Sequence, residues 1–376
     1  MREGWEIKKL GEICEILDSQ RKPVTKKDRK EGLYPYYGAS GIQDYVDSYI
    51  FDGRYLLVGE DGAKWGTNDK SAFIIEGKCW VNNHAHILKV YDNLKDSFIE
   101  YYLVFKDLNE YITGAIVPKL TQQALKNIPI PVPPLSEQEK IVAELDCLSG
   151  IIKKKKQQLK ELDSLAQSIF YEMFGDPVEN EKGWEVAPLK ESVIEMFLGP
   201  FGSALKTECY VNQEDSFCMV YEQKHAIRKT LDTETHYINK EKFESLKRFE
   251  VHAGDFIMSC RGTIGEVYRL PSNAPLGIIH PSLMKIRIKE DKYSSTFFVN
   301  LLSYIIKNEC TVGNCIQMAI TAKELGQRKS ILPPLSLQQQ FANKIELIEK
   351  QKELIKQSLA ETETLFDSRM DFYFNS

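Results

Sequence analysis

The sequence lacks the segments that would place a chain in or across a membrane. Its 376 residues include no run of about eighteen apolar residues, and the stretch from Met1 to Trp5 has no apolar core typical of a secretory signal. With 43% hydrophobic and 27% charged residues, the composition predicts a folded, cytoplasmic protein. A chain of this length exceeds one ordinary hydrophobic core, so we expect two or more domains.

The cysteines show no spacing that would indicate disulfide bonds or a metal site. The eight cysteines form no C-x-x-C pair and no cluster with histidine at ligand spacing. This argues against a disulfide scaffold and a zinc site, and it favours reduced thiols. The cysteines are Cys14, Cys79, Cys147, Cys209, Cys218, Cys260, Cys310 and Cys315.

Motifs for catalysis are missing as well. The chain has no Gly-x-x-x-x-Gly-Lys-Ser/Thr loop for ATP and no Asn/Asp-Pro-Pro-aromatic motif for amino methylation. Asp215 with Glu222-Gln223-Lys224 is the nearest approach to a nuclease pattern, but the other half of the chain has no counterpart. His84 and His86 would share one face of a strand, yet no carboxylate or cysteine stands beside them, which favours polar recognition or packing over metal binding. We therefore predict no catalytic, cofactor-binding or metal-binding residue in this chain.

The most informative feature is an internal repeat. Pro133-Pro134-Leu135-Ser136 recurs as Pro333-Pro334-Leu335-Ser336, an offset of 200 that also aligns Thr121 with Thr321 and Gln138 with Gln338. Upstream, Trp5-Glu6-Ile7 matches Trp184-Glu185-Val186 at an offset of 179. About twenty residues are therefore inserted in the second copy, between Trp184 and Phe297.

Each copy has the same internal order, a mixed segment followed by a long helix. Short apolar runs indicate strands at 55–58, 72–75, 256–258 and 284–288, and spacings of three and four indicate helices at 97–108 and 295–307. After Pro-Pro-Leu, apolar residues advance by alternating steps of four and three, which is a heptad seam. We expect Ser136 and Ser336 to be helix N-caps, Glu139 to complete a capping box, and Gly175-Asp176-Pro177 to end the first helix.

The two seams predict that the long helices pair with each other. The first seam contains Ile141, Leu145, Leu148, Ile152, Lys155, Leu159, Leu162, Ala166, Ile169 and Met173. The second contains Phe341, Ile345, Ile348, Lys352, Ile355, Leu359, Thr362, Phe366, Arg369 and Tyr373. A helix of about 38 residues spans about 57 Å and needs a partner along its apolar side. We predict an antiparallel intramolecular pair in which Lys155 and Lys352 help to fix the register; the alternative is that each helix packs on its own domain.

The predicted architecture is an α+β fold with an approximate two-fold internal repeat. We assign two globular α/β domains to residues 1–135 and 177–335, and two long antiparallel coiled-coil helices to residues 136–176 and 336–376. Most of the net charge of −5 comes from the helices, because the globular segments carry 18 Lys/Arg against 19 Asp/Glu and 20 against 20. Basic stretches at 21–30 and 224–229 could follow phosphates, although solvated loops would look the same.

Gly-rich polar loops between the predicted strands hold the side chains best suited to reading a ligand. Arg, Lys, Asn and Ser side chains hydrogen-bond base edges, and nearby glycines let the backbone approach closely; the alternative is that these groups make and cap tight turns. The candidate DNA-binding residues are Lys26, Lys27, Lys64, Trp65, Thr67, Asn68, Asn82, Asn83, His84, Lys224, Arg228, Lys229, Ser259, Arg261, Thr263, His280 and Ser282. If Arg261 makes a bidentate guanine contact, Arg261→Ala should relax specificity by about 1–3 kcal/mol at one half-site.

These motifs resemble a known family. The W-E-hydrophobic opening, the run Ile128-Pro129-Ile130-Pro131-Val132-Pro133-Pro134-Leu135, the helix ending in 169–177, and their second copies look like the DNA specificity subunit of type I restriction-modification systems. The resemblance covers essentially the whole chain, and the duplicated order is its most specific part. In the second copy Leu337 and Gln339 replace Glu137 and Glu139, which weakens the capping box there.

The resemblance implies that each globular domain reads one half of a bipartite double-stranded DNA target. The helices would set the gap and offer two docking surfaces to two methyltransferase subunits. S-adenosylmethionine, ATP and Mg²⁺ would then belong to the methyltransferase and restriction subunits, with no cofactor in this chain. Three alternatives remain: a coiled-coil scaffold with protein-binding end domains, a self-contained nuclease or methyltransferase, and a specificity subunit of a methylation-only or fused system.

Overall fold

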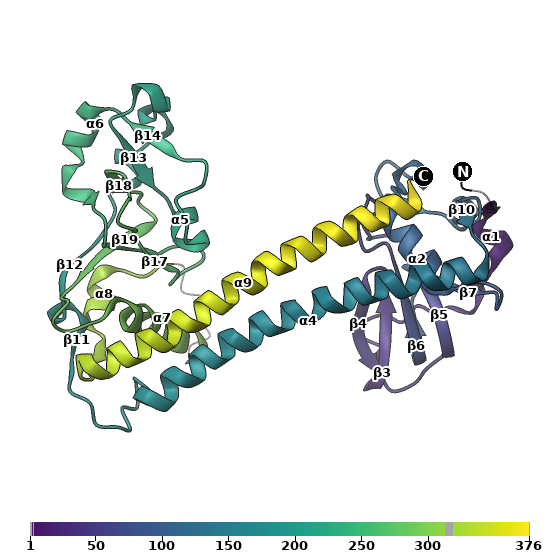
Figure 1. The fold of residues 1–376 in the computed structure, drawn as a ribbon, viewed down its shortest axis with the longest axis horizontal. Coiled ribbons are helices and arrows are strands. Elements are labelled where there is room, and N and C mark those ends of the chain that lie inside the picture. The colour runs from purple at the N-terminus through teal and green to yellow at the C-terminus, as the bar shows by residue number, and fades with distance from the viewer. Residues whose placement is uncertain (1, 3, 313–318, 376) are drawn as a thin grey trace. The chain divides into compact units, whose positions relative to one another are not determined.

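The computed structural model describes residues 2, 4–312 and 319–375 (Figure 1). The chain divides into two compact units, and each takes one half of each long helix. Unit 1 comprises Met1–Gln158 and Ile355–Ser376, and unit 2 comprises Leu159–Leu354. No helix in the described ranges is long and apolar enough to cross a membrane. The mixture of sheets and helices confirms the predicted α+β class.

Unit 1 is built around a sheet with strand order β2-β7-β5-β6-β3-β4. Its strands pair antiparallel except β3 with β6, and a separate ladder joins β1 to β10. The strands are β1 (Glu6–Lys9), β2 (Cys14–Ile16), β3 (Glu31–Gly38), β4 (Gly41–Val46), β5 (Phe51–Gly59), β6 (Ala72–Val81), β7 (Ala85–Val90), β8 (Ile112–Thr113), β9 (Lys119–Leu120) and β10 (Pro129–Val132). The shorter helices are α1 (Leu10–Ile13), α2 (Asp96–Phe105) and α3 (Gln122–Lys126).

In its described residues, unit 2 has two four-stranded sheets, with strand orders β12-β19-β16-β17 and β14-β13-β18-β15, and a separate ladder joins β11 to β20. Its strands are β11 (Val186–Pro188), β12 (Val193–Leu198), β13 (Cys218–Tyr221), β14 (His236–Ile238), β15 (Glu250–Val251), β16 (Phe256–Ser259), β17 (Val267–Arg269), β18 (Gly277–Ile279), β19 (Leu283–Ile288) and β20 (Lys329–Ile331). Its shorter helices are α5 (Gln223–Arg228), α6 (Lys240–Ser245), α7 (Ser295–Val312) and α8 (Ala322–Gln327). All four predicted strands and both predicted shorter helices are present.

The two units repeat one arrangement and differ in one insertion. The order β2-β7-β5-β6 in unit 1 matches β12-β19-β16-β17 in unit 2, and the β1·β10 ladder matches β11·β20. In unit 1 the β3–β4 hairpin lies between β2 and β5. At the corresponding place in unit 2, between β12 and β16, lie β13, β14 and β15 of the second sheet together with α5 and α6. The predicted insertion therefore lies between β12 and β16.

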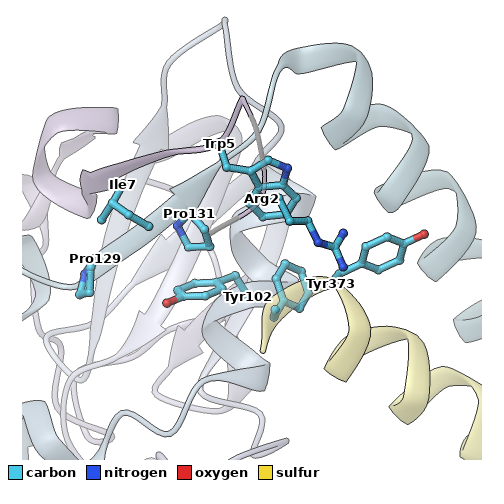
Figure 2. Close-up of a pocket in the computed structure, with 8 residues that line it drawn as sticks. Arg2, Trp5, Ile7, Tyr102, Pro129, Pro131 and Tyr373 are labelled. Atoms are coloured by element: carbon cyan, nitrogen blue, oxygen red, sulfur yellow. The ribbon is translucent and has the colours of Figure 1, made fainter. Parts of the chain in front are cut away.

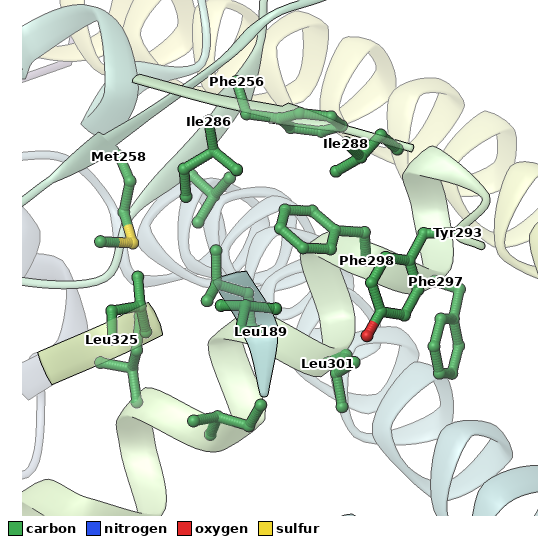
Figure 3. Packing of buried hydrophobic residues seen from close by; sticks show 14 of the residues in the cluster. Leu189, Phe256, Met258, Ile286, Ile288, Tyr293, Phe297, Phe298, Leu301 and Leu325 are labelled. Atoms are coloured by element: carbon green, nitrogen blue, oxygen red, sulfur yellow. The ribbon is translucent and has the colours of Figure 1, made fainter. Parts of the chain in front are cut away.

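The apolar core of unit 2 forms where the sheet β12-β19-β16-β17 packs against α7 (Figure 3). Phe256 and Met258 of β16 and Ile286 of β19 face Phe298 and Leu301 of α7, and all five side chains are buried. These positions alternate along the strands, as expected of a sheet with one face on a core. The spacing of three along α7 puts its two residues on the same side.

Two long helices complete both units, α4 (Leu135–Phe174) and α9 (Leu335–Phe374) (Figure 1). Within unit 1, Glu144 binds Arg369, and Lys155 Nζ donates to Ser358 O at 2.8 Å and to Thr362 Oγ1 at 2.7 Å. Residue numbers rise along α4 as they fall along α9, so the halves that meet in unit 1 run antiparallel. Every predicted seam residue is at least partly buried. The helices therefore pair with each other, as predicted.

In unit 2 the same pairing involves the second lysine of the seams. Lys352 Nζ lies 2.8 Å from Asp163 of α4 and 2.8 Å from Glu349 one turn away on α9. Two polar contacts, one in each unit, therefore tie the helices at defined positions along otherwise apolar seams. A cation that finds its acceptors in only one alignment disfavours slipped pairings, which supports the predicted role in register.

The starts of the long helices differ from the prediction. The helix α4 begins at Leu135, and Pro134 O accepts from the backbone N–H of Glu137 and Gln138. Ser136 therefore lies inside the first turn, not at the N-cap, and Glu139 pairs with Lys95 at 3.0 Å instead of closing a capping box. The same holds for Ser336, because α9 begins at Leu335.

The end of α4 agrees with the prediction. Gly175 follows the last helical residue with φ of 72° and donates its N–H to Tyr171 O at 2.8 Å. This left-handed conformation is costly for any residue with a Cβ atom, so glycine ends the helix cleanly.

The repeated glutamine of the Pro-Pro-Leu motif holds each helix to its own unit. Gln138 Oε1 accepts from Lys95 N at 2.9 Å, and its Nε2 donates to Pro133 O at 2.9 Å. Gln338 makes the same two contacts with Ser294 N and Pro333 O, both at 2.8 Å. Both glutamines are about 1% exposed or less.

We expect Gln138→Leu to lower the free energy of unfolding of unit 1 by about 2 kcal/mol, because a buried N–H and a buried carbonyl lose their partners. Hydrogen exchange read by segment on the full chain measures the change. Gln123→Leu, on the exposed side of α3, is the control and should change little. Equal protection of the two variants would contradict a structural role for Gln138.

The described cysteine side chains form no disulfide, in line with the prediction. Cys14, Cys79, Cys218 and Cys260 are buried as free thiols, and Cys147 and Cys209 are also free. Burial raises the pKa of Cys14 and of Cys79 to about 12, so these thiols act as small apolar core groups. The side chains of Cys310 and Cys315 lie outside the described part of the chain.

Candidate nucleic-acid interface

The candidate interface in unit 1 is formed where β5 ends. Glu60 N donates to His84 O at 2.8 Å, and Leu120 N donates to Glu60 O at 2.8 Å. Asp61 forms an isolated bridge with Lys119 at the start of β9. Three segments far apart in the sequence, the loop after β5, the turn before β7 and β9, are thereby tied together by backbone hydrogen bonds.

Of the residues predicted in this region, Lys64, Thr67, Asn68, Asn83 and His84 are exposed. His84 Nδ1 faces the carboxylate of Asp61, so the imidazole is oriented at the surface of the loop. These side chains are free to meet a ligand.

Two residues predicted here have structural roles instead. Trp65 is 7% exposed, packs in the core of unit 1, and donates its indole N–H to Gly59 O at 3.0 Å. Asn82 is 2% exposed; its Nδ2 donates to Gln43 Oε1 at 3.1 Å and its Oδ1 accepts from His84 N at 2.8 Å. Trp65 was predicted as a candidate DNA-binding residue, but here it anchors the loop. Both are withdrawn as direct contacts.

Lys26 and Lys27 lie exposed in the segment that joins the 3-10 turn η1 (Asp18–Gln20) to β3. Val24 N, in the same segment, donates to the hydroxyl of Tyr36 on β3 at 3.2 Å. The segment begins at Arg21, which reaches Glu60 below the loop after β5 at 2.6 Å. The basic segment is thus anchored to the same part of unit 1.

Beneath the loop lies a buried network of charges that the sequence analysis did not anticipate. Arg21 Nη1 and Lys119 Nζ each lie 2.6 Å from a carboxylate oxygen of Glu60. His86 Nδ1 lies 2.6 Å from Asp18 Oδ2, and its Nε2 lies 2.7 Å from Leu120 O. Both ring nitrogens of His86 thus lie within hydrogen-bonding distance of an oxygen atom.

The surroundings stabilise the charged forms of both carboxylates. Burial raises the pKa of Asp18, but the hydrogen bond and charge of His86, followed by Arg21, outweigh burial and leave that pKa below 3.8. For Glu60, burial likewise raises the pKa, and the hydrogen bonds from Lys119 and Arg21 bring it below 4.5. The network therefore consists of paired ions that fix the base of the loop.

This network also answers whether the two neighbouring histidines bind a metal. Within the described residues, one group of ligand types comes close together, namely Asp18, Glu60 and His86. Its oxygens are already taken by Arg21 and Lys119 and its imidazole by oxygen acceptors, so the donor set suits hydrogen bonding better than a metal. His84 is on the surface and His86 is inside, so they do not share a face.

Unit 2 repeats the backbone of this interface. Cys260 N donates to Ser282 O at 2.9 Å, Ile320 N donates to Cys260 O at 3.1 Å, and Arg261 forms an isolated bridge with Ala319. These contacts match those of unit 1: Cys260, Arg261, Ala319 and Ile320 stand 200 positions after Glu60, Asp61, Lys119 and Leu120, and Ser282 stands 198 positions after His84. The loops begin alike, because Gly62 and Gly262 both have a left-handed φ, 69° and 65°.

Most of the predicted residues of unit 2 surround this second loop. Arg228, Lys229, Arg261 and Thr263 are exposed, and Lys224 and His280 are partly buried. Helix α5 is fastened to the loop by a residue that was not predicted, because Gln223 Nε2 donates to Arg261 O at 2.6 Å. The chain therefore brings the basic stretch at 224–229 and the Gly-rich loop together.

The two predicted serines of unit 2 are buried and act within the fold. Ser259 is fully buried, and its Oγ accepts from Glu266 N at 3.0 Å. Ser282 is 9% exposed and its Oγ lies 2.8 Å from His280 Nδ1. Their hydroxyl groups make hydrogen bonds within the turns, which was the alternative to base contacts in the sequence analysis. We therefore withdraw Ser259 and Ser282 as direct DNA contacts.

Glu222 occupies the centre of this region and was part of the proposed nuclease pattern. Its carboxylate lies 3.0 Å from Lys224 Nζ and 3.0 Å from His236 Nδ1, and the ring of His236 stacks on Tyr210. Burial raises the pKa of Glu222, but hydrogen bonds from Lys224 and then His236 bring it below its ordinary value. Glu222 thus holds cations in place. One of its partners, His236, comes from β14, so the fold reveals that contact.

Unit 1 also contains a small pocket of about 170 Å³ beside the end of α9 (Figure 2). Its lining includes Trp5, Tyr102 and Tyr373, together with Pro129 and Pro131 of β10. The side chain of Arg2 lies over the ring of Phe372 at 4.2 Å. None of the predicted DNA-binding residues lines this pocket. It belongs to the packing of the repeated W-E motif against the long helix.

Comparison with known proteins gives a consistent result. The family described as type I restriction modification DNA specificity domain matches residues 2–162 and 221–364. A putative MjaX specificity subunit of Methanocaldococcus jannaschii is 27% identical, with 95% of this chain and 91% of that protein covered. The putative specificity subunit S.HindORF215P of Haemophilus influenzae is 40% identical over 151 residues, which are 40% of this chain and 39% of that protein.

The fold has solved counterparts. The S subunit of a type I restriction-modification system from M. genitalium has a TM-score of 0.59 at 14% identity, with 97% of this chain and 95% of that chain covered. Family match, repeat and fold agree, and the chain belongs to the family of type I restriction-modification specificity subunits.

Proposed function

We propose that each unit of this specificity subunit reads one half of a bipartite sequence in double-stranded DNA. The observation that carries the proposal is the repeated loop, built on the same backbone hydrogen bonds after β5 and after β16. In both units exposed polar and basic side chains surround that loop. The units differ in nearly every side chain there, so the two halves of the target differ.

Contacts divide by chemistry into those that position the duplex and those that read it. Lys26, Lys27 and Lys64 in unit 1, and Arg228 and Lys229 in unit 2, are exposed cations suited to phosphates. Thr67, Asn68, Asn83, His84, Arg261, Thr263 and His280 are the side chains suited to base edges. Positioning contacts give affinity that falls steeply with salt, whereas base contacts give the sequence preference.

The long helices set the gap between the half-sites and dock two methyltransferase subunits. Lys155 and Lys352 fix the helix register, and the repeated Gln138 and Gln338 fix each helix to its unit, which supports a spacer of defined length. Adenine methylation with S-adenosylmethionine, and cleavage driven by ATP with Mg²⁺, belong to the methyltransferase and restriction subunits. This chain acts as the non-catalytic recognition subunit.

Mapping of methylated adenines by long-read sequencing tests the proposal. Cells that express this chain with its cognate methyltransferase should carry a two-part motif with an unspecified gap, and deletion of this chain should remove it. Methylation that persists unchanged after deletion, with the methyltransferase demonstrably active, would contradict the proposal and favour a scaffold with protein-binding end domains. If the two-part motif is methylated but unmodified DNA is not cleaved, the chain belongs to a methylation-only system.

A further inference from the structure

We infer that Asp61 and Arg261 are equivalent base-reading positions with opposite hydrogen-bonding character. Asp61 would accept a hydrogen bond from the exocyclic amine of a cytosine in the half-site of unit 1. Arg261 would donate to a guanine in the half-site of unit 2. This inference rests on the proposed function, and it adds Asp61 and the kind of base at each position.

The equivalence follows from the backbone alone. Asp61 bridges Lys119 and Arg261 bridges Ala319, so both partners are 58 positions further along the chain. The strands before them have matching registers, because Gly59 pairs with Ala85 and Ser259 pairs with Leu283. Each is followed by a glycine with positive φ. The two side chains therefore leave corresponding points of the same turn.

Asp61 is held ready to accept a hydrogen bond. Its side chain is 21% exposed and one carboxylate oxygen, Oδ1, is engaged by His84 Nδ1. Within the described residues, no hydrogen bond engages Oδ2. Just below, Lys119 and Arg21 balance the charges of Glu60 and Asp18, so in the described part of the chain these cations leave Oδ2 of Asp61 unpaired.

Arg261 is held at its backbone and open at its side chain. Gln223 Nε2 binds its carbonyl oxygen at 2.6 Å, and the residue is exposed. In the part of the chain that the structure describes, no acidic group pairs with its guanidinium. The layer below contains Cys260 in place of Glu60, with Met284 in place of His86, so the ionic network of unit 1 has no counterpart and the cation is available to a ligand.

The chemistry of the base edges then assigns the partners. In the major groove, guanine offers two acceptors, O6 and N7, which match the two donors of a guanidinium. Cytosine offers the N4 amine, a donor that matches a carboxylate. A carboxylate offers no donor to guanine O6 and N7, and a guanidinium offers no acceptor to cytosine N4. The charge reversal at one backbone position therefore implies different bases at the corresponding positions of the two half-sites.

The test uses the complete complex of this chain with its methyltransferase, and its readout is the methylated motif. Asp61→Ala should make one position of one half-site about tenfold less selective, and Arg261→Ala should do the same in the other half-site only. Asp61→Asn, which preserves size, should shift the preference at that position from cytosine to adenine, because an amide pairs with adenine N6 and N7.

Matched controls lie on the neighbouring strands β6 and β17, opposite the first halves of β5 and β16. Glu76 faces Arg54 near the start of β5, with 75% of its side chain exposed, and Arg269 faces Phe256 at the start of β16. Glu76→Ala and Arg269→Ala should leave both half-sites unchanged. Hydrogen exchange on each variant shows whether the loop keeps its structure.

The outcomes separate this inference from the proposed function. If the wild-type complex gives a bipartite motif that depends on this chain, the function stands. An Asp61→Asn variant that then keeps the wild-type motif, or weakens methylation equally at all sequences, overturns the assignment of Asp61. The same results for Arg261→Ala overturn the assignment of Arg261. Absence of any bipartite motif in the wild type overturns the proposed function itself.

Discussion

Replacing Phe174 by alanine is expected to lower the free energy of unfolding of unit 2 by about 3–5 kcal/mol, the range for deleting a fully buried aromatic ring. Phe174 has no exposed surface and closes the last turn of α4. Its ring centroid lies 4.6 Å from that of Phe297 in α7 and 5.4 Å from that of Phe341 in α9. The change opens a cavity at a point where three helices meet, and such a rigid site collapses poorly.

The measurement is urea unfolding of the full chain followed by segment-resolved hydrogen exchange, which reads the two units separately. Phe201→Ala is the matched control, because that phenylalanine of unit 2 is 89% exposed and should change stability by less than about 0.5 kcal/mol. A Phe174→Ala variant as stable as Phe201→Ala would show that the α4 end does not support unit 2. Protection should fall in unit 2 first, since every neighbour of Phe174 lies there.

Much of this fold could be predicted because the sequence contains an internal repeat, so the same pattern of strands and helices occurs twice. The offset of 200 between the Pro-Pro-Leu motifs holds at Asp61 and Arg261 in the structure, far upstream of the motif itself. Every residue of the predicted heptad seams is at least partly buried in α4 and α9, although the seams omit Phe170, Phe174 and Met370, which are also buried. Periodic signals of this kind depend on local spacing, so a single sequence carries them.

The features that were missed depend on contacts between distant segments. The network of Asp18, Arg21, Glu60, His86 and Lys119 joins residues up to a hundred positions apart, and no local pattern marks it. Trp65 was a candidate DNA-binding residue because it lies in a Gly-rich polar loop, but its side chain packs in the core of unit 1. The long helices begin at Leu135 and Leu335, where Pro134 O and Pro334 O accept the first backbone hydrogen bonds. The serine that follows lies inside the first turn and is not the N-cap.

Asp61, which we infer to accept a hydrogen bond from a base, was not among the predicted DNA-binding residues. Those residues are mainly cations, amides and hydroxyls, because phosphate contacts dominate such interfaces. A carboxylate gains from a duplex only through a base amine, and its place in the loop became evident once Asp61 and Arg261 were seen at equivalent backbone positions. The offset of 200 alone would have paired the two residues, so the signal was present in the sequence.

The second large effect concerns the buried ions of unit 1. Glu60→Gln is expected to lower the free energy of unfolding of unit 1 by about 3 kcal/mol at pH 7, because removing one member of a buried ion cluster leaves its partners uncompensated. Arg21 has 11% of its side chain exposed; without Glu60 it keeps its hydrogen bonds to Ala85 O and Asp18 O, but its remaining carboxylate contact is the weaker one with Asp18 at 3.3 Å. Glutamine preserves the size of the side chain, so the change reports charge and not packing.

The loss should depend on pH in a defined direction. The pKa of Glu60 and that of Asp18 are lower in the folded protein than their ordinary values of 4.5 and 3.8. Their contribution to stability is therefore fully present above those ordinary values and is lost as the pH falls through the folded pKa. Below about pH 4.5 the wild-type protein loses the contribution that ionised Glu60 and Asp18 make to the free energy of unfolding. The glutamine variant lacks the contribution of Glu60 at every pH.

Urea unfolding of wild type and Glu60→Gln at pH 7 and pH 3.5 measures the difference, with unit 1 read by hydrogen exchange. The gap in stability should narrow at pH 3.5, because protonation of Glu60 does in the wild type what the substitution does in the variant. Glu76→Gln, with its side chain 75% exposed and 3.5 Å from Arg54, should behave like the wild type at both pH values. A gap of the same size at pH 7 and pH 3.5 would mean that Glu60 acts through its shape, and the ionic account of the loop would be wrong.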